Sequence, residues 1–280
     1  MVLNSYSKIN LSLLVNSKQK SGLHNIQTYF CLINLKDKVK IKKIKGNSDK
    51  VNFTGPFSKL INKRDNSIKS ILALLRKLKL ISSCYSVVVK KNIPVFSGLG
   101  GGSSNAAALI NHFTKKKELL EKDKSYFSRK LGSDLRLFFG SKQIFQKNLN
   151  QTIDLKSKLN FYFILVYPFL KSSTKDVYSK VKVYKNLKAD SFYKKSSKLK
   201  IIHYLKYQEN SLEKIVISKF PIIQKILLEL RVIKNCQFSR VTGSGSACFG
   251  VFLTKKSADL GLKKIKKKFP KFWCVVGKTI

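Results

Sequence analysis

The chain of 280 residues has few acidic residues, few histidines and no long apolar run. Its 14 Asp and Glu residues stand against 57 Lys and Arg residues, for a formal net charge of +43. The three histidines lie far apart in the sequence, so the spacing does not predict a transition-metal site. The longest apolar stretch covers residues 161–167, whereas about 20 apolar residues are needed to cross a bilayer. We therefore predict no membrane partner, and no export signal is visible.

Cysteine is also scarce, and the cysteines that are present do not form pairs. The chain has five of them, an odd number, and none stands in C-x-x-C spacing. This pattern excludes a disulfide framework or a zinc site of the common kinds and predicts reduced, mostly buried thiols. A location in the bacterial cytoplasm is expected, although a plastid protein without its transit peptide would have the same composition.

The excess of positive charge raises the possibility of a nucleic-acid partner. However, only six of the basic residues are Arg, the residue whose planar fork reads bases and phosphates, and the lysines are spread along the whole chain. We interpret the excess as a compositional bias of a lysine-favouring genome and predict no specific nucleic-acid partner. The positive field would still attract anionic substrates. A basic RNA-binding protein remains the alternative.

Hydrophobic periodicity predicts both strands and helices in the first half of the chain. Alternation predicts strands over residues 6–15, 26–35 and 38–44 as an antiparallel meander, a polar loop over 46–66, a helix over 67–80 and a strand over 86–90. In the first strand Lys8 and Asn10 share the face opposite Ile9, Leu11 and Leu13. Helices are then expected from about Ser103 or Ser104 and over 118–130.

The second half of the chain repeats this mixture of elements. Strands are predicted over 160–167, 248–253 and 272–276, and helices over 209–218, 222–233 and 255–268, after a lysine-rich connection at 180–200. The fold class is therefore α+β. We predict two lobes, residues 1–155 and 156–280.

A glycine-rich segment between the strand at 86–90 and the following helix is the strongest functional signal. Four glycines in five positions allow the backbone to approach a ligand closely, and the helix start supplies free N–H groups and partial positive charge. The segment predicts a phosphate-binding loop, with a simple flexible turn as the alternative. Its residues are Pro94, Val95, Phe96, Ser97, Gly98, Leu99, Gly100, Gly101, Gly102, Ser103 and Ser104.

The glycine-rich loop does not match the common nucleotide-binding motifs. No Gly-Lys-Ser/Thr ends it, and G-x-G-x-x-G in a βαβ setting is absent, as are the H-R-D and D-F-G motifs of protein kinases. Instead, three ordered motifs resemble those of the GHMP kinases. They are K-I-N-L at 8–11, G-L-G-G-G-S-S at 98–104 followed by Asn105, where many members have Asp and some Asn, and T-G-S-G-S at 242–246.

Within the GHMP kinases, further segments resemble the kinases that act on 4-diphosphocytidyl-2-C-methyl-D-erythritol. Residues 131–139, LGSDLRLFF, are similar to the family's L-G-A-D-V-P-F-F, and residues 210–213, NSLE, to its N-D-L-E. The resemblance implies an N-terminal ATP-binding lobe of a type also found in a ribosomal protein and a ferredoxin-like C-terminal lobe, with the active site in the cleft. It also implies a substrate with a cytidine diphosphate group.

The resemblance implies catalytic roles for two residues. Asp134 would accept the proton of the substrate hydroxyl, and Lys8 would be its cationic partner. The loop at 94–104 would bind ATP, and Mg²⁺ would be carried mainly by the nucleotide, so no protein-bound metal is expected. Without the resemblance, Lys8 would be interpreted as a solvated surface residue, and Asp134 could equally be a surface ion pair or a helix-end residue.

The resemblance also places residues at the substrate. They are Asn10, His24, Phe30, Thr174, Tyr178, Gly243 and Ser244. His24 would bond the cytosine and the aromatic rings would stack on the cytidine, whereas a role in the core is the alternative for His24, Phe30 and Tyr178. The family's usual Gly-Tyr-His reads Gly-Leu-His at 22–24, so one aromatic wall is missing.

The cytidyl-erythritol kinase is the leading interpretation on these grounds. The alternatives are a GHMP kinase for another small alcohol, such as homoserine or mevalonate, and the RNA-binding protein. A monomer or a weak homodimer is expected.

Overall fold

The computed structural model describes residues 1–20, 22–62, 64, 66–114, 120–149, 151–155, 159–185 and 197–280. The chain forms two compact units, each built from segments that are distant in the sequence. The first unit contains Met1–Ser7, Leu35–Val95 and Gly100–Ser141, and the second contains Lys8–Asn34, Phe96–Leu99 and Lys142–Ile280. The predicted lobe boundary between residues 155 and 156 stays a prediction.

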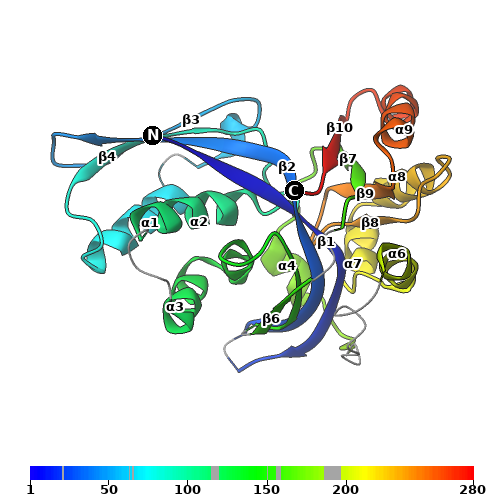
Figure 1. Cartoon of the computed structure of the whole chain (residues 1–280), viewed down its shortest axis with the longest axis horizontal. Coiled ribbons are helices and arrows are strands. Elements are labelled where there is room, and N and C mark those ends of the chain that lie inside the picture. Colours follow the sequence, from blue (N-terminus) through cyan, green and yellow to red (C-terminus); the bar gives the residue numbers. More distant parts are fainter. Residues whose placement is uncertain are drawn as a thin grey trace. The chain divides into compact units, whose positions relative to one another are not determined.

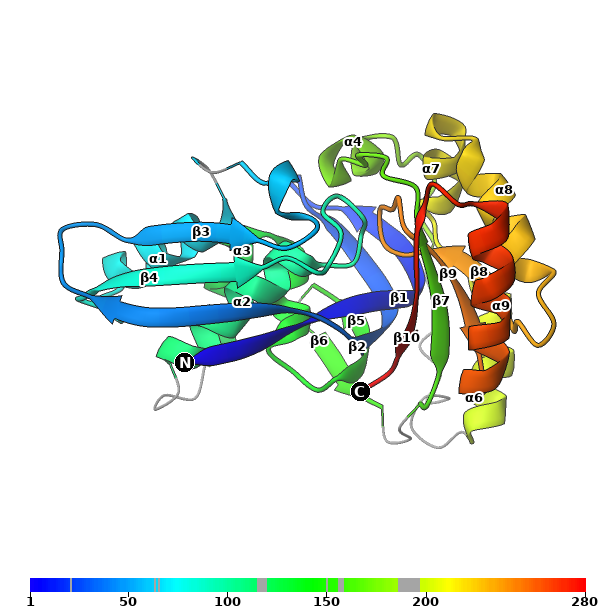
Figure 2. The same ribbon diagram turned by 90° about the horizontal axis from the view of Figure 1, so that it is seen from above.

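Two long strands, β1 (Val2–Lys18) and β2 (His24–Ile44), pair with each other and run through both units. In the first unit, the second half of β2 pairs antiparallel with β4 (Cys84–Lys90), which pairs parallel with β3 (Lys50–Thr54). The helices α1 (Ser67–Lys77) and α2 (Gly101–Phe113) cover one face of this sheet (Figures 1 and 2). The unit also holds α3 (Glu121–Leu131) and two short 3-10 helices, Ser58–Leu60 and Ser133–Phe138.

The core of the first unit explains why α1 forms where its periodicity predicts. Its apolar residues recur at intervals of three and four and face the sheet, and the side chain of Asn66 caps its first turn by accepting from Lys69 N at 3.1 Å. The strands and α2 contribute β-branched and small residues that fill the remaining space. The buried side chains include Val39, Ile41, Ile68, Ile71, Leu72, Leu75, Val87, Val89, Ala106, Ala107, Leu109 and Ile110.

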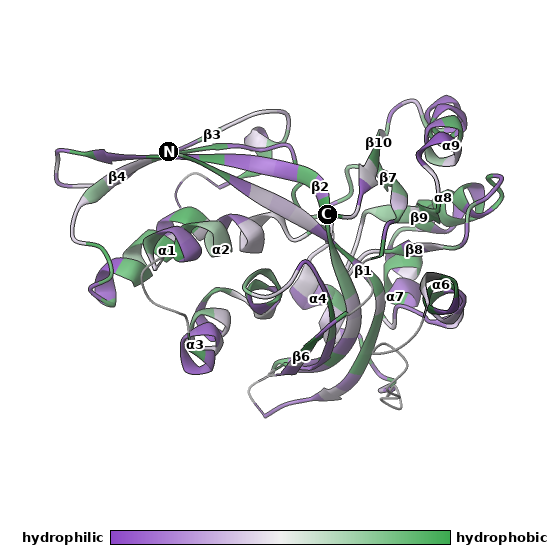
Figure 3. Cartoon of the chain, in the orientation of Figure 1, coloured by the Kyte–Doolittle hydropathy of each residue, from purple (hydrophilic) through white to green (hydrophobic). Residues whose placement is uncertain are grey.

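The second unit contains a four-stranded antiparallel sheet in the order β10-β7-β9-β8. Its strands are β7 (Tyr162–Tyr167), β8 (Ser239–Val241), β9 (Cys248–Phe252) and β10 (Trp273–Lys278). Two helices, α8 (Ile222–Arg231) and α9 (Lys255–Lys268), bury their apolar residues in one core with this sheet. In Figure 3 hydrophilic residues are prominent on α3 and along α9, whose lysines lie in the solvent.

The second unit also contains β1 from Lys8 onward, the first half of β2 and several shorter elements. The start of β2 pairs antiparallel with β5 (Gln143–Asn148), which pairs with β6 (Gln151–Asp154). Three short helices are α4 (Thr174–Ser179), α6 (Lys198–Tyr207) and α7 (Glu213–Lys219). Within the described residues, no helix is both long and apolar enough to cross a membrane.

The predicted elements agree with the observed ones most closely where the local signals are strong. The α+β class is confirmed, and α9 has its predicted bounds. The two strands predicted at 26–35 and 38–44 are one continuous strand, β2, and the predicted loop over 46–66 contains β3. The elements α4, α6, β5, β6 and β8 were not predicted, and part of the predicted connection, residues 186–196, lies outside the described residues.

All five cysteines have free thiols. They are Cys31, Cys84, Cys236, Cys248 and Cys274, of which Cys31, Cys248 and Cys274 are buried. Burial raises the pKa of the Cys236 and Cys274 thiols to about 11, so these groups are protonated thiols at neutral pH.

Candidate functional site

The second unit brings the three predicted motifs together through backbone hydrogen bonds. The N–H of Lys8 in β1 donates to the carbonyl of Leu99 in the glycine loop at 3.0 Å. The N–H of Asn10 donates to the hydroxyl of Thr242 at 3.2 Å, and the N–H of Ala247 donates to a loop carbonyl at 3.0 Å. Segments more than 200 residues apart in the sequence therefore meet in one place.

Close packing between these motifs explains why two positions are glycine. A Cβ atom on Gly98 would stand 2.1 Å from the carbonyl oxygen of Thr242, and its φ of +79° is in the left-handed region. A Cβ atom on Gly243, whose φ is +56°, would stand 3.0 Å from Lys8 Nζ. The ammonium group of Lys8 thus lies against the backbone of the third motif.

Lys8 and Asn10 share one face of β1, as the alternation predicts, but that face is buried. The ammonium group of Lys8 donates a hydrogen bond to Asn10 Oδ1, and the two residues are 2% and 1% exposed. Asn10 Nδ2 donates to Thr28 Oγ1 at 2.9 Å. Because Lys8 is buried, the alternative of a solvated surface lysine is wrong. A buried ammonium group needs hydrogen-bond acceptors, and Asn10 Oδ1 is one of them.

The second half of the glycine loop belongs to the first unit and forms the start of α2. The helix begins at Gly101, two residues before the predicted Ser103, and its N-cap Gly100 has a φ of +71° and no side chain to bond the first-turn N–H groups. Gly102 is exposed, and Gly101 and Ser103 are half-buried. The N–H groups of this first turn and its partial positive charge fit a phosphate group. The loop residues thus fit the phosphates of ATP.

The segment Asn210–Glu213, noted for its similarity to N-D-L-E, holds the third motif in place. Asn210 Nδ2 donates to the carbonyls of Val241 and Gly243 at 2.9 and 2.8 Å. A carboxylate oxygen of Glu213 accepts from the N–H of Val241 at 2.8 Å, and burial raises the pKa of this carboxyl group. The role of this segment is visible only in the structure.

Arg240 was not predicted from the sequence, although it lies two residues before the third motif. Its guanidinium group is buried and donates to the carbonyls of Leu11 at 2.7 Å and Lys206 at 3.1 Å, and also to the carbonyl of Gln208. The group lies 4.3 Å from the centre of the Phe238 ring, and burial lowers its pKa to about 10. The scarcity of Arg in a chain of 51 lysines was the one sequence signal that could have indicated a structural role for Arg240.

Ser244 of the third motif contacts the segment that begins α4. The hydroxyl groups of Thr174 and Ser244 lie 3.0 Å apart, and the hydroxyl of Ser172 donates to the carbonyl of Ser244 at 2.6 Å. Thr174 is exposed. The structure thus brings together two of the predicted substrate-binding residues.

The same unit brings together His24 and Tyr178, which are 154 positions apart in the sequence. Their ring centroids lie 5.1 Å apart with a tilt of 39°, and both residues are half-buried. Partial burial, together with the charge of Lys18, lowers the pKa of His24 below its usual 6.5, so the imidazole is neutral at pH 7. Leu23, at the position where the family has an aromatic residue, is 38% exposed beside this pair.

The structure favours the core alternative for one predicted substrate residue. Phe30 in β2 is fully buried, so its ring offers no surface to a ligand in this structure. Its contact with a substrate stays a prediction.

Asp134 lies in the first unit, whereas Lys8 lies in the second, so their pairing stays a prediction. Asp134 is half-buried in the 3-10 helix Ser133–Phe138, where its neighbour Leu135 is fully buried. Arg136, one of the departures from the family pattern, donates to Ser125 Oγ at 3.0 Å and pairs with Glu121. These contacts attach the 3-10 helix to α3.

No group of three or more His, Cys, Asp or Glu side chains is placed to hold a metal ion in the part of the chain that the structure describes.

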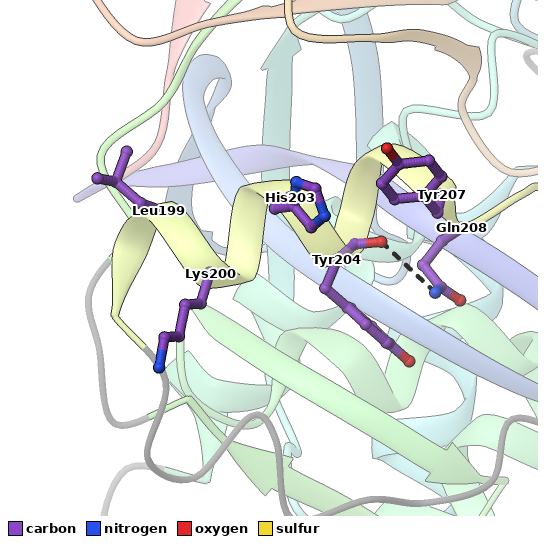
Figure 4. Close-up of a pocket in the computed structure, with 6 residues that line it drawn as sticks. All are labelled: Leu199, Lys200, His203, Tyr204, Tyr207 and Gln208. Carbon is purple, nitrogen blue, oxygen red and sulfur yellow. Dashed lines mark hydrogen bonds between the residues drawn. The ribbon is translucent and has the colours of Figure 1, made fainter.

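A hollow of about 490 Å³ lies along α6 (Figure 4). It is lined by Leu199, Lys200, His203, Tyr204, Tyr207 and Gln208, so it is made without the predicted site residues.

Comparison with known proteins supports the motif assignment. The family described as GHMP kinases N terminal domain matches residues 66–132. A protein of Pelagibacter ubique named 4-diphosphocytidyl-2-C-methyl-D-erythritol kinase is 36% identical over 281 residues, which cover 99% of this chain and 98% of that protein. A protein of the same name from Anaplasma phagocytophilum is 33% identical, with 94% and 89% covered.

Solved structures share the fold. A crystal structure of 4-(cytidine 5'-diphospho)-2C-methyl-D-erythritol kinase has a TM-score of 0.74 at 21% identity, with both chains fully covered. Homoserine kinase from Cytophaga hutchinsonii has a TM-score of 0.72 at 15% identity and covers all of this chain and 94% of its own. The predicted GHMP kinase fold is thus confirmed. The full-length identity to the named relatives shows that the chain belongs to the 4-diphosphocytidyl-2-C-methyl-D-erythritol kinase family of the GHMP kinases.

Proposed function

We propose that this chain transfers the γ-phosphate of ATP to the 2-hydroxyl group of 4-diphosphocytidyl-2-C-methyl-D-erythritol, a step of the non-mevalonate route to isoprenoid precursors. The observation that carries the proposal is the glycine loop, which ends in a helix start without a capping side chain and is bonded to the Lys8 strand. The names of the relatives support the substrate.

The phosphate end of the site would be formed by residues 94–104. The first-turn N–H groups of α2 would bond phosphate oxygens, and the hydroxyls of Ser103 and Ser104 would add further contacts. Mg²⁺ would be carried mainly by the nucleotide phosphates and would neutralise their charge during transfer. The positive charge of the whole chain would help to attract the anionic substrates.

The chemical step requires a positioned hydroxyl group and an acceptor for its proton. Asp134 is the proposed base, which takes the proton of the 2-hydroxyl as its oxygen attacks the γ-phosphorus. Lys8 is the proposed cationic partner, which keeps the carboxylate ionised and orients the hydroxyl. Its ammonium group is already fixed against Asn10 and Gly243.

The cytidine diphosphate end would be recognised by the His24–Tyr178 pair. The neutral imidazole offers both a donor and an acceptor, which suits the edge of a cytosine ring, and Tyr178 offers an aromatic surface. Asn10, Thr174, Gly243 and Ser244 would contact the rest of the substrate, and Phe30 would support the pocket from the core. The exposed Leu23 replaces an aromatic wall, so binding of cytidine should be weaker than in relatives with Tyr there.

The test is ATP turnover by purified protein offered the cytidyl-erythritol substrate, beside homoserine and mevalonate. Turnover should be specific to the first substrate and should be lost in Asp134→Asn. The matched control is Asp154→Asn, the same change at an exposed position in β6, which should keep full activity. Turnover of homoserine or mevalonate alone would support another GHMP kinase instead.

Absence of turnover with all three alcohols, together with tight RNA binding that weakens steeply with salt, would support the RNA-binding alternative. A location in the bacterial cytoplasm and a monomeric or weakly dimeric state stay predictions. Sedimentation analysis of the purified chain would decide the oligomeric state.

A further inference from the structure

A buried ion pair in the first unit lies directly behind the glycine loop, and none of the motifs includes its two residues. Asp37 in β2 is 0% exposed and Lys91, which follows β4, is 3% exposed. The ammonium group of Lys91 donates to Asp37 Oδ2. The other carboxylate oxygen, Oδ1, accepts from the backbone N–H groups of Asn92 at 2.7 Å and Ile93 at 2.9 Å. The pair therefore holds the backbone that leads into Pro94.

Asn105 connects this ion pair to the start of α2. Its Oδ1 accepts from Lys91 Nζ at 3.0 Å, and its Nδ2 donates to Asp37 Oδ2 at 3.0 Å and to Ser5 Oγ at 2.7 Å. The Ser5 hydroxyl in turn donates to Ser104 Oγ at 2.8 Å, so the network reaches the last residue of the glycine loop. In this chain, where Asp37 and Lys91 are both neighbours of position 105, the side chain there both donates and accepts.

The network also touches the loop backbone. A Cβ atom on Gly101, the first residue of α2, would stand 3.2 Å from Lys91 Nζ. The ammonium group therefore packs against the backbone of the turn whose N–H groups are the proposed phosphate ligands. Asp37 and Lys91 fix the chain before the loop, and Asn105 fixes it after the loop.

Stability alone does not explain why a buried ion pair is present at this place. Transferring both charges from water is costly, and apolar residues of similar size often stabilise a protein equally well or better. Burial disfavours the charged form of Lys91 and lowers its pKa, while Asp37 opposes this effect. The network does add a fixed geometry, because the six hydrogen bonds made by Asp37 and Asn105 join β2, the segment after β4 and α2 at one point.

We propose that Asp37, Lys91 and Asn105 are positioning residues that hold both ends of the glycine loop in its ATP-binding conformation. The inference rests on the proposed function, since it assumes that the loop binds ATP. It predicts an effect on ATP affinity, because a loop that is not fixed must be ordered on binding. It predicts little effect on the phosphoryl-transfer step once ATP is bound.

The test compares Asn105→Ala, Asn105→Asp and Lys91→Met with wild type by calorimetric titration of ATP and by steady-state kinetics. We expect the dissociation constant and the KM for ATP to rise roughly tenfold, with kcat at saturating ATP changed less than about twofold. Asn105→Asp keeps the size of the side chain but places a carboxylate beside Asp37, so its loss should be the largest of the three. Asn105→Ala leaves the ion pair intact and should fold even if Lys91→Met does not.

The matched control is another ion pair of the same unit, Asp49 with Arg76. Two hydrogen bonds of 3.0 and 3.1 Å join it, and Asp49 also accepts from the N–H of Tyr85, away from the loop. Asp49→Asn should lower the melting temperature without changing the affinity for ATP.

An unchanged ATP dissociation constant in folded Asn105→Ala and Asn105→Asp would overturn the proposal, as would a fall in kcat at constant KM. An equal loss of affinity in Asp49→Asn would also overturn it, because the loss would then result from general destabilisation.

The titration of ATP needs no second substrate. If wild type binds ATP but does not phosphorylate the cytidyl-erythritol, the proposed substrate fails while this test still gives its answer.

Discussion

The side-chain amide of Asn210 donates a hydrogen bond to the carbonyl oxygen of Gly243 at 2.8 Å, inside the loop that faces the Lys8 ammonium group. The same amide donates to the carbonyl of Val241 at 2.9 Å. One buried side chain thus holds both the end of β8 and Gly243 of the third motif. The relative position of Lys8 and Gly243 depends on it.

Asn210→Asp should destabilise the protein and weaken substrate binding. The change keeps the size of the side chain but replaces a donor by a carboxylate oxygen that faces two carbonyl oxygens, which should cost about 2–3 kcal/mol. Urea unfolding measures the loss, and the KM for the cytidyl-erythritol substrate reports the loop. Asn52→Asp, at an exposed position of β3, is the control and should change neither quantity. Equal stability of the two variants would contradict the role of Asn210.

Arg240→Met should lower the free energy of unfolding by about 3 kcal/mol. Methionine fills much of the space of the stem, but the carbonyl groups of Leu11, Lys206 and Gln208 then lose their buried donor. Denaturant unfolding gives the value. Arg64→Met, at an exposed site, is the control and should change it by less than about 0.5 kcal/mol. A loss as small as that of the control would show that water replaces the guanidinium group.

Gly98→Ala should abolish ATP binding and lower the yield of folded protein. The added Cβ would stand 2.1 Å from the carbonyl oxygen of Thr242, and the positive φ of position 98 is unfavourable for alanine. Gly140→Ala is the matched control, because a Cβ there meets nothing within 4 Å and its φ is not positive. Calorimetric ATP titration and circular dichroism should separate the two variants. Wild-type affinity in Gly98→Ala would mean that the loop can move away from the third motif.

The pH dependence of stability should contain a contribution from His24. Its pKa in the folded protein lies below the unfolded value of 6.5, because burial and then Lys18 disfavour the charged form. The unfolded chain therefore binds more protons as the pH falls through 6.5, and stability should fall as the pH is lowered below this value. Well above pH 7 both states are neutral at this position and the contribution vanishes.

His24→Gln should reduce this loss of stability on the acid side. Urea unfolding at pH 7.5 and 5.5 measures the difference for each variant. His203→Gln, at an exposed position of α6, should retain the wild-type loss. If His24→Gln and wild type lose the same stability between the two pH values, another group causes the acid sensitivity.

Local patterns were sufficient for the elements with strong periodicity or clear end signals. The basic helix α9 has its predicted bounds because Thr254 caps it and its apolar residues repeat at helical spacing. By contrast, β3 lies in a segment of polar residues, and its place is set by parallel pairing with β4, more than 30 residues later in the chain. Such pairing leaves no local signal in a short, exposed strand.

The sequence by itself determined the glycine loop, the strand of Lys8 and Asn10, and the family, because these depend on short runs of residues with specific backbone or side-chain chemistry. Only the tertiary structure decided that Lys8 is buried, that Phe30 lies in the core, that Asn210 holds the third motif, and that Arg240 bonds the carbonyl group of Leu11. Each of these facts depends on hydrogen bonds or packing between residues far apart in the chain. A single sequence does not specify such partners until the chain folds.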